Sequence, residues 1–483
     1  MKILMPVHYF LPERQAGAEI YTYNLSKELS KRHEVVVLYK DADYTKDDYS
    51  ICRGEYDGLS VYKIINNSSY STFEETYNNP GMDKRFHEIL DELKPDVVHF
   101  QHLLNLSVNF IQIAKKKGIP VVFTLHEYWL MCPNGGQMIK NRKKGSSCLS
   151  PELCYDVNPQ ECARCITSLS GKRLIPKRYY SLIRKRSANF IVRGGQSSGL
   201  KKSSFGSGLR RTIISCDRFA KTWKEKVLWT LKKKDCFAMA QYRSTHIRNI
   251  CKDVDLFIAP SPFLRSMFIK FGIPENKIVY ADYGMNTAFY GNISRQASEK
   301  IRFTFIGSPV VHKGVHVLVE AFNGIVDDRA ELNIYGDLSL QPEYSYPLQK
   351  SAKNPNIHFR GRFENDKIAD VLSNTDVLVV PSIWFENSPL TIHEAFIAGI
   401  PVVTSNLGGM ADLVQDGVNG LLFKVGNAAD LRSKILSLIR DRGLIQRLSQ
   451  GIPKVKTIEE DARFIEGLYL KLVKGYKTVA IDA

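Results

Sequence analysis

Short apolar runs alternate with amphipathic stretches along much of the chain, and this alternation constrains the fold more than any other feature. The first series has strand-like runs at 2–7, 35–39, 95–100 and 120–125, with an amphipathic stretch at 18–31 after the first run. Near-continuous apolar strands joined by crossover helices form parallel sheets that are covered on both faces. The first series therefore predicts a doubly wound α/β domain.

A second series of the same kind follows. Its strand-like runs lie at 301–307, 331–335, 357–359, 376–381 and 401–404. One hydrophobic core rarely serves 483 residues, so two series predict two Rossmann-like, doubly wound domains.

Glycine and asparagine break both patterns near 283–294, and we place the join between the domains there. The first domain is then expected over 1–285 and the second over 286–456. The remaining segment, 457–483, begins with apolar residues on one helical stripe and is expected to form a separate helix.

The alternation stops over 132–250 and resumes with a strand-like run at 254–261, which predicts an insertion in the first domain. Within it, 171–250 holds 21 Lys and Arg against three acids, a local charge of +18 in a chain of +17. A segment this basic can bind an anionic membrane surface or nucleic acid. Its aromatic side chains are few and unpatterned, unlike those that stack on nucleic acid, and an apolar stripe at 218–234 favours a membrane surface. We expect a membrane partner and no nucleic acid.

Five of the nine cysteines fall within the first 34 residues of this insertion, from Cys132 to Cys165. Cys162 and Cys165 form a C-x2-C pair, and with Cys148 and Cys154 they could bind a structural zinc ion. The other spacings are irregular, so reduced core cysteines or a redox-sensitive pair are the alternatives.

Two glutamates eight positions apart follow the apolar run 376–381. Glu386 is expected on the loop that leaves the strand, and Glu394 two turns inside the next helix. Both side chains could then address one ligand laid across the helix N-terminus, where backbone N–H groups favour phosphate. The turn that opens this helix holds Ser388, Pro389, Leu390 and Thr391. For an arbitrary pair of glutamates, a capped turn and a solvated helix face would be the simpler interpretation.

Two further loops follow strand-like runs of the second series. Gly307 and Ser308 open a loop that reaches Lys313 before an amphipathic stretch, and a lysine there can pair with phosphate as a point charge. Gly361 and Arg362 follow the run 357–359, where glycine permits close approach of a ligand. An ordinary surface lysine and an ordinary turn are the alternatives.

The order of strand, carboxylate loop, phosphate-facing turn and helix carboxylate resembles the E-x7-E signature of retaining glycosyltransferases of family 4. Members of that family have the GT-B architecture, in which two Rossmann-like domains face each other across a cleft, and they use nucleotide-diphospho-sugars. The resemblance implies that Glu394 holds the ribose, that Glu386 addresses the donor sugar and that Lys313 pairs with the diphosphate. It also implies that Gly361 to Phe363 seat the nucleobase, that catalysis needs no metal or other cofactor, and that the helix within 457–483 crosses back to the first domain.

The chain departs from this family pattern in two places. Ser308 stands where an arginine is common, so a second cation would have to come from elsewhere, with Arg360 and Arg362 nearby in the sequence. Only Gly17 remains of the usual glycine pair before the first long helix. The resemblance implies that this loop faces the donor phosphates.

His126 follows the strand-like run 120–125, at the edge where such sheets bind ligands. The resemblance implies that it touches the donor sugar or organises the acceptor hydroxyl. A histidine satisfied by a neighbouring backbone group is the alternative.

The sequence thus predicts a retaining glycosyltransferase, of hexosyltransferase type, that modifies a lipid-linked or glycan acceptor in cell-surface polysaccharide or glycolipid biosynthesis. A nucleotide-sugar epimerase of the same architecture and a nucleic-acid-binding protein are the alternatives. No apolar run reaches the ~18 residues of a membrane span, and the N-terminus does not resemble a secretory signal. A cytoplasmic enzyme, peripheral on the inner face of the cell membrane, is expected.

Overall fold

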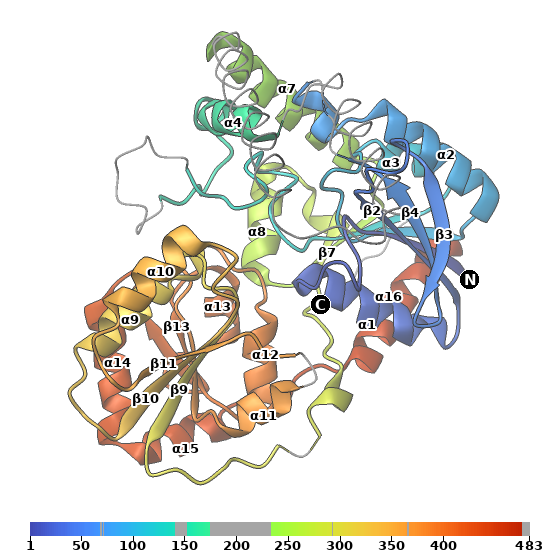
Figure 1. Ribbon diagram of the computed structural model, residues 1–483. Coiled ribbons are helices and arrows are strands. Elements are labelled where there is room, and N and C mark those ends of the chain that lie inside the picture. The colour runs from blue at the N-terminus through green and yellow to red at the C-terminus, as the bar shows by residue number, and fades with distance from the viewer. Residues whose placement is uncertain are drawn as a thin grey trace, which may run out of the picture.

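Two sheets covered by helices organise the chain, as the computed structural model shows (Figure 1). The structure describes residues 1–67, 70, 72–140, 152–173, 233–291, 293–364 and 367–475.

The first domain has an eight-stranded sheet of order β3-β4-β2-β1-β5-β6-β7-β8. Its strands are β1 (Lys2–Pro6), β2 (Glu34–Asp41), β3 (Ile51–Tyr56), β4 (Leu59–Ile65), β5 (Val97–Phe100), β6 (Val121–Thr124), β7 (Leu256–Ala259) and β8 (Ile278–Tyr280). All neighbouring pairs are parallel except β3 and β4. The strand order reverses between β1 and β5, and this switch point is where open α/β sheets bind ligands.

The second domain has a six-stranded, wholly parallel sheet of order β11-β10-β9-β12-β13-β14. Its strands are β9 (Ile301–Ile306), β10 (Ala330–Tyr335), β11 (Ile357–Gly361), β12 (Val377–Val380), β13 (Val402–Ser405) and β14 (Gly420–Phe423). Here the order reverses between β9 and β12, so the loops that follow these two strands meet at a second switch point.

Helices connect the strands and cover both sheets. Those of the first domain are α1 (Gly17–Ser30), α2 (Pro80–Leu93), α3 (Phe110–Lys116), α4 (Pro159–Arg173), α7 (Lys233–Cys251) and α8 (Pro262–Phe271). Those that follow are α9 (Val315–Asn323), α10 (Pro342–Ser351), α11 (Ile368–Ser373), α12 (Leu390–Ile397), α13 (Gly408–Leu413), α14 (Ala428–Arg440), α15 (Arg442–Gln450) and α16 (Ile458–Val473). No helix in these described parts is long and apolar enough to cross a membrane.

Both faces of the first sheet are buried, as consecutive residues of β1 illustrate. Ile3 and Met5 contribute to a core shared with α1 and α16, whereas Leu4 contributes to one shared with α2, α3, α7 and α8. Burial on both faces explains why the parallel strands read as continuous apolar runs. The predicted α/β architecture is confirmed by the two sheets.

Four strands lack a sequence prediction: β3, β4, β8 and β14. The edge strand β3 is largely exposed, and β8 has three residues, so neither produces a continuous apolar run. Edge pairing that depends on a neighbouring strand leaves little local signal in the sequence.

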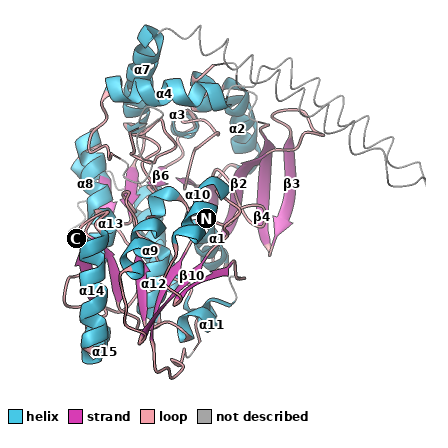
Figure 2. Ribbon diagram, turned by 60° about the vertical axis from the view of Figure 1, so that its left-hand side comes forward, coloured by secondary structure: helices cyan, strands magenta, loops and turns pink. Residues whose placement is uncertain are grey.

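Helix α7 contributes to the core of the first domain, although the sequence places it in the insertion over 132–250. Its second half buries Ile247 and Ile250, and Nη2 of Arg243 donates to the carbonyl oxygen of Trp129 at 2.5 Å. Helix α4 packs against α7 (Figure 2). The end of the predicted insertion thus buries apolar side chains in the first domain, which the alternation pattern alone does not indicate, and the boundaries of the insertion stay a prediction. Most of the predicted stripe at 218–234 lies outside the described residues.

Helix α16, red in Figure 1, lies beside α1 on the first domain. Tyr21 donates from its hydroxyl to Oδ2 of Asp461 at 2.8 Å, and His99 Nδ1 lies 2.5 Å from the hydroxyl of Tyr469. The chain therefore passes from the first domain to the second and returns to the first.

The two crossings run side by side. The backbone N–H of Met285 donates to the carbonyl oxygen of Lys456, and that of Ile458 donates to the carbonyl oxygen of Met285, both at 2.9 Å. Gly284 approaches the second crossing closely, since an added Cβ would lie 2.7 Å from the carbonyl oxygen of Thr457. These backbone contacts tie the domain connections together beside α16.

Candidate active site

An ion pair joins the loops that follow β9 and β12. Nζ of Lys313 lies 2.6 Å from Oε1 of Glu386, which also accepts from Oγ of Ser382 at 2.7 Å and from Nε1 of Trp384 at 2.8 Å. Burial acts to raise the pKa of Glu386, but the Lys313 charge and these hydrogen bonds outweigh it and lower the pKa. Glu386 is therefore held as a carboxylate at the switch point of the second sheet.

The turn that carries Lys313 depends on Gly314. This glycine has φ +69°, and an added Cβ would lie 1.9 Å from the carbonyl oxygen of Pro381. The backbone N–H of Ile383 donates to the carbonyl oxygen of His312 at 2.9 Å, which fastens the same turn to the segment after β12. Only glycine permits this close approach, so the loops of β9 and β12 meet because no side chain separates them.

Glu394 lies on α12, one turn after the helix begins at Leu390. The predicted position two turns inside the helix is wrong, because Pro389 stands outside the helix as its N-cap. Oε1 of Glu394 accepts from the hydroxyl of Tyr290 at 3.2 Å. Burial raises the pKa of Glu394, although the Tyr290 hydrogen bond acts to lower it. The second carboxylate is thus desolvated, and its hydrogen bond comes from a neutral hydroxyl.

The loop between the two glutamates is fastened to the first domain. Asn387 accepts through Oδ1 from Oγ of Ser261 at 2.8 Å and donates through Nδ2 to the carbonyl oxygen of Leu125 at 3.1 Å. Ser388 donates to Oδ1 of Asp282 at 2.7 Å. The E-x7-E segment therefore lies where the two domains touch.

The start of α1 also reaches this junction. Gly17 faces Leu390 at the start of α12, and an added Cβ would lie 3.8 Å from Cδ1 of Leu390. The N-terminal ends of two helices from different domains are therefore neighbours. Thr391 occupies the first turn of α12, and Gly409 at the start of α13 donates its N–H to the carbonyl oxygen of Glu386 at 2.9 Å.

The loop after β11 lies beside the one after β10. Gly336 donates its N–H to the carbonyl oxygen of Gly361 at 2.9 Å, and the rings of Tyr335 and Phe363 meet edge to face at 5.7 Å. Arg362 is exposed at this position. These residues border the carboxyl edge of the sheet, on the β10 and β11 side of the carboxylate loop.

The predicted second cation is not found at Arg360. Its Nε donates to Oδ1 of Asn333 at 2.7 Å, so its side chain extends back along β10 rather than toward the turn of Gly307 and Ser308. A residue of a strand alternates faces with its neighbours, and sequence proximity to a loop does not place its side chain there. Ser308 itself supplies a backbone acceptor to the N–H of Val310 at 2.9 Å.

Both ring nitrogens of His126 have partners. Nε2 lies 2.8 Å from Oε1 of Gln101, and Nδ1 lies 2.7 Å from the hydroxyl of Tyr283. An amide oxygen only accepts, so Nε2 carries the proton and Nδ1 accepts from Tyr283. Burial, followed by the neighbouring His102, lowers the pKa of His126 well below its usual value. The imidazole is therefore neutral and fixed in one tautomer.

The cysteines of the insertion are free thiols in the described residues. Burial raises the pKa of Cys154 and of Cys162 to about 12, and Cys165 is buried. Across the described ranges, no group of three His, Cys, Asp or Glu side chains could hold a metal ion. Cys148 lies outside those ranges, so the zinc site stays a prediction, as does the membrane contact of 171–250, most of which is also outside them.

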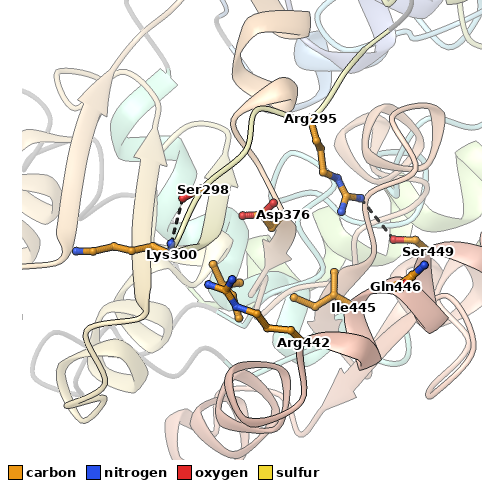
Figure 3. A pocket seen from close by; sticks show the side chains of 9 residues that line it. Arg295, Ser298, Lys300, Asp376, Arg442, Ile445, Gln446 and Ser449 are labelled. Carbon is orange, nitrogen blue, oxygen red and sulfur yellow. Dashed lines mark hydrogen bonds between the residues drawn. The ribbon is translucent and has the colours of Figure 1, made fainter.

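A cavity of about 420 Å3 lies at the opposite end of the second sheet (Figure 3). Ile301 and Asp376, which stand at the amino ends of β9 and β12, line it. Two of its charged side chains already have partners within the protein. Arg295 donates to the carbonyl oxygen of Gly399 at 2.6 Å, and Asp376 pairs with Arg302 outside the cavity at 3.0 Å. This cavity is separate from the carboxylate loop, which follows the carboxyl ends of the same strands.

Several residues that hold the site together were not predicted from the sequence. Ser382 and Trp384 hold Glu386, Tyr290 holds Glu394, and Ser261 anchors the loop. Tyr290 lies 104 positions from Glu394, a separation that no local pattern encodes. Ser382 and Trp384 could be found from their closeness to Glu386 in the sequence, although Ser and Trp at this spacing form no recognised motif.

Family models match both domains. A model described as Glycosyltransferase Family 4 matches residues 16–147, and one described as Glycosyl transferases group 1 matches residues 289–455. Together they cover more than half of the 483 residues. The second match contains the Lys313 turn and both glutamates.

The curated relatives include glycosyltransferases. An N,N'-diacetylbacillosaminyl-diphospho-undecaprenol alpha-1,3-N-acetylgalactosaminyltransferase of Campylobacter jejuni is 27% identical over 44% of this chain and 56% of its own length. A phosphatidyl-myo-inositol mannosyltransferase of Mycobacterium leprae is 30% identical over 35% of this chain and 44% of its own length. The alignment thus spans about half of each relative.

Solved glycosyltransferase structures share the fold over the whole chain. A sucrose-phosphate synthase from Thermosynechococcus elongatus superposes with a TM-score of 0.62 at 14% identity, covering 98% of this chain and 99% of that one. Anabaena HepE in complex with UDP and glucose has a TM-score of 0.57 at 14% identity, covering 99% and 100%. By its two domain matches and by its two facing α/β domains, the chain belongs to glycosyltransferase family 4 and has the GT-B fold.

Proposed function

We propose that this glycosyltransferase moves a sugar, with retention of anomeric configuration, from a nucleoside-diphospho-sugar to a lipid-linked or polysaccharide acceptor of the cell surface. The observation that carries the proposal is the contact of Lys313 with Glu386 on the loop that leads to the helix of Glu394. This helix begins at Leu390, which lies next to Gly17 of the other domain. A diphosphate needs the cation and the helix N–H groups, whereas sugar and ribose hydroxyls need the carboxylates.

The donor class is supported by two considerations. Carboxylates accept vicinal hydroxyl groups well, and Glu394 is desolvated and available for the ribose, apart from its bond to Tyr290. The HepE structure of the same fold is described in complex with UDP and glucose. We propose that Gly361, Arg362 and Phe363 border the nucleobase, and that Gly307, Ser308 and the turn at 388–391 border the diphosphate.

The acceptor class is supported by the relatives. The names of the Campylobacter and Mycobacterium enzymes give a diphospho-undecaprenol and a phosphatidyl-inositol acceptor, both lipid-linked. A basic segment at 171–250 with a charge of +18 suits an enzyme that works at an anionic membrane surface. We propose that the protein is peripheral on the cytoplasmic face of such a membrane.

Within this proposal, His126 acts as a positioning residue. Its two nitrogens are engaged by Gln101 and Tyr283, so it has no free nitrogen to accept a proton from an acceptor hydroxyl while these bonds persist. The acid-base work then falls to the leaving phosphate, and the proposal needs no metal for catalysis.

Donor binding tests the proposal directly. The protein is incubated with UDP-, GDP- and ADP-sugars, and its melting temperature is followed. One nucleotide class should stabilise it, and Glu394→Ala and Lys313→Ala should each reduce the stabilisation. Glu320→Ala, an exposed carboxylate on α9, is the matched control for the first variant. If the nucleotide sugar stabilised both site variants as much as the parent protein, the assignment of this site to the donor would be wrong.

Product analysis separates a transferase from an epimerase. With donor and a lipid-linked acceptor, a transferase yields a glycoside of the acceptor. A retaining transferase gives this glycoside the anomeric configuration of the donor, which NMR of the anomeric position determines. An epimerase releases a rearranged sugar without any acceptor. Turnover that survives EDTA would support the absence of a catalytic metal.

A further inference from the structure

We propose that the cavity at the amino ends of β9 and β12 is a second ligand site, and that it binds a small phosphate ester with a hydroxylated body. This site lies apart from the E-x7-E loop and takes no part in the proposed transfer. Its ligand is therefore additional to the donor and the acceptor.

Three segments enclose the cavity: the connection at 295–301 that leads into β9, the residue before β12, and helix α15. Its volume of about 420 Å3 falls within the range of ~300–1,000 Å3 that is typical of sites for small molecules. The cavity is thus large enough for a ligand of several polar groups.

Two arginines reach the cavity from different elements (Figure 3). Arg295 comes from the connection before β9, and Arg442 comes from the first turn of α15. The side chain of Lys300 extends away from both arginines, and its Nζ donates to Oδ1 of Asn356 at 2.9 Å. The positive charge that faces the cavity therefore comes from guanidinium groups.

The contacts of both arginines within the protein are with neutral groups. Nη2 of Arg295 donates to the carbonyl oxygen of Gly399 at 2.6 Å and to Oγ of Ser449 at 3.4 Å. Nη2 of Arg442 donates to the carbonyl oxygen of Glu299. Within the parts of the chain that the structure describes, neither arginine forms an ion pair. A neutral acceptor satisfies one N–H but leaves the positive charge uncompensated, with other N–H groups available to a ligand.

Asp376 does not cancel this charge. Its Oδ2 accepts from Nε of Arg302 at 3.0 Å and its Oδ1 accepts from Nη2 of Arg302 at 3.0 Å, so both oxygens are already used. Among the described residues, Asp376 is the acidic side chain that lines the cavity. Three guanidinium groups thus stand against one carboxylate, an excess of two positive charges.

An anion in the cavity would offset this excess. Burial lowers the pKa of Arg295, and the charge of Asp376 acts against this shift without removing it. A phosphate ester carries about −1.5 to −2 at pH 7, which matches the excess of the cavity. Guanidinium groups also bind phosphate through paired N–H groups, a geometry that suits phosphate oxygens.

The rest of the lining suits a hydroxylated body. Ser298, Gln446 and Ser449 supply hydroxyl and amide groups, which can donate to and accept from ligand hydroxyls. Ile301 and Ile445 supply an apolar wall for carbon-bound hydrogens. The proposed ligand is therefore a phosphorylated sugar or polyol.

This site and the proposed donor site lie at opposite ends of α12. The helix begins at Leu390, which faces Gly17, and it is followed at its other end by Gly399, which accepts from Arg295. No residue that lines the cavity belongs to the E-x7-E loop. A phosphate ester and a nucleotide sugar should therefore bind without competing.

The test follows the melting temperature of the full chain at constant ionic strength. Glucose 6-phosphate, ribose 5-phosphate and glycerol 3-phosphate are compared with glucose, ribose and glycerol. At least one ester should stabilise the protein, and its uncharged counterpart should not. By calorimetric titration, Arg442→Ala should weaken binding of that ester about ten- to hundredfold. Arg440→Ala, an exposed arginine of α14 outside the cavity, should bind it as the parent does.

The proposed donor site also attracts phosphate, so the titration is repeated with Lys313→Ala. Ester binding that persists in Lys313→Ala and falls in Arg442→Ala would support the second site, whether or not any nucleotide sugar stabilises the protein. Binding that is lost in Lys313→Ala and kept in Arg442→Ala would assign the ester to the donor site and overturn the proposal. Failure of all three esters to bind, or equal affinities in Arg442→Ala and Arg440→Ala, would overturn it as well.

Discussion

Nζ of Lys313 lies 2.6 Å from Oε1 of Glu386, although 73 positions separate the two residues in the chain. The contact links the loops that follow the two central strands of the second sheet, β9 and β12. A buried carboxylate needs a partner that offsets its negative charge. For Glu386 this partner is Lys313, the lysine that the family resemblance assigns to the diphosphate. We expect a bound diphosphate to compete with Glu386 for this cation.

Lys313→Ala is expected to weaken donor binding about ten- to hundredfold, since a hydrogen bond to a charged group contributes about 1.5–3 kcal/mol. Calorimetric titration with the stabilising nucleotide measures this. Lys350→Ala, an exposed lysine at the end of α10, should leave the affinity unchanged. Equal affinities in the parent and in Lys313→Ala would show that Lys313 only neutralises Glu386.

Glu394→Gln is expected to stabilise the unliganded protein above acidic pH. Burial raises the pKa of Glu394 above its ordinary value of 4.5. A carboxyl with a raised pKa contributes stability that is present below 4.5 and is lost as pH rises through its folded-state pKa. Glutamine does not ionise, so the advantage of the variant should grow with pH and then level off.

Urea unfolding over a pH series that starts near 4.5 measures this advantage. The same variant should lose donor affinity, because a ribose hydroxyl would meet an amide instead of a carboxylate. A variant that is less stable than the parent at neutral pH would contradict the burial argument.

Gly314→Ala is expected to disrupt the Lys313 turn. Its φ is +69° and the new Cβ would lie 1.9 Å from the carbonyl oxygen of Pro381, so the loops after β9 and β12 must separate. Gly417→Ala is the matched control, with φ +76° and nothing within 4 Å. The control should lose only the about 1–2 kcal/mol of a left-handed alanine.

Gly314→Ala should therefore be less stable than Gly417→Ala in urea and should bind the donor more weakly. Similar losses in the two variants would mean that positive φ, and not the contact between the loops, is what requires glycine at 314.

Asp461→Ala is expected to destabilise the protein by about 1–3 kcal/mol, because it leaves the buried hydroxyl of Tyr21 without its acceptor and removes the carboxylate that pairs with the partly exposed Lys456. Asp461 is 1% exposed, accepts from Tyr21 at 2.8 Å and pairs with Lys456 at 2.5 Å. The exposed Glu459→Ala on the same helix should stay within about 0.5 kcal/mol of the parent. Equilibrium unfolding of both variants checks whether α16 depends on this contact.

The two-domain α/β architecture and the positions of ten strands are predictable from the sequence, because strands buried on both faces must be apolar throughout. The E-x7-E segment is also predictable from the sequence, because Glu386 lies on the loop after one strand and Glu394 lies on the helix that follows this loop. The short or exposed strands β3 and β8 escape this reasoning because they bury too few side chains to impose a pattern.

Contacts between residues from distant parts of the chain could not be predicted from the sequence. His8 and His102 follow strands without any motif around them, and only the order β1-β5-β6 brings them between Glu19 and Glu127. His126 reads as a catalytic candidate in the sequence, whereas its contacts with Gln101 and Tyr283 favour a positioning role.

The sequence by itself determines which segments become buried strands and which loops carry the glycine, lysine and glutamates, because these features depend on residues that are neighbours in the chain. Only the tertiary structure decides which charges meet and which hydrogen bonds form. Lys313 meets Glu386 because β9 and β12 are adjacent, and His126 meets Gln101 because β5 and β6 are adjacent. Electrostatic compensation and hydrogen bonding depend on distances in space, which local sequence does not fix.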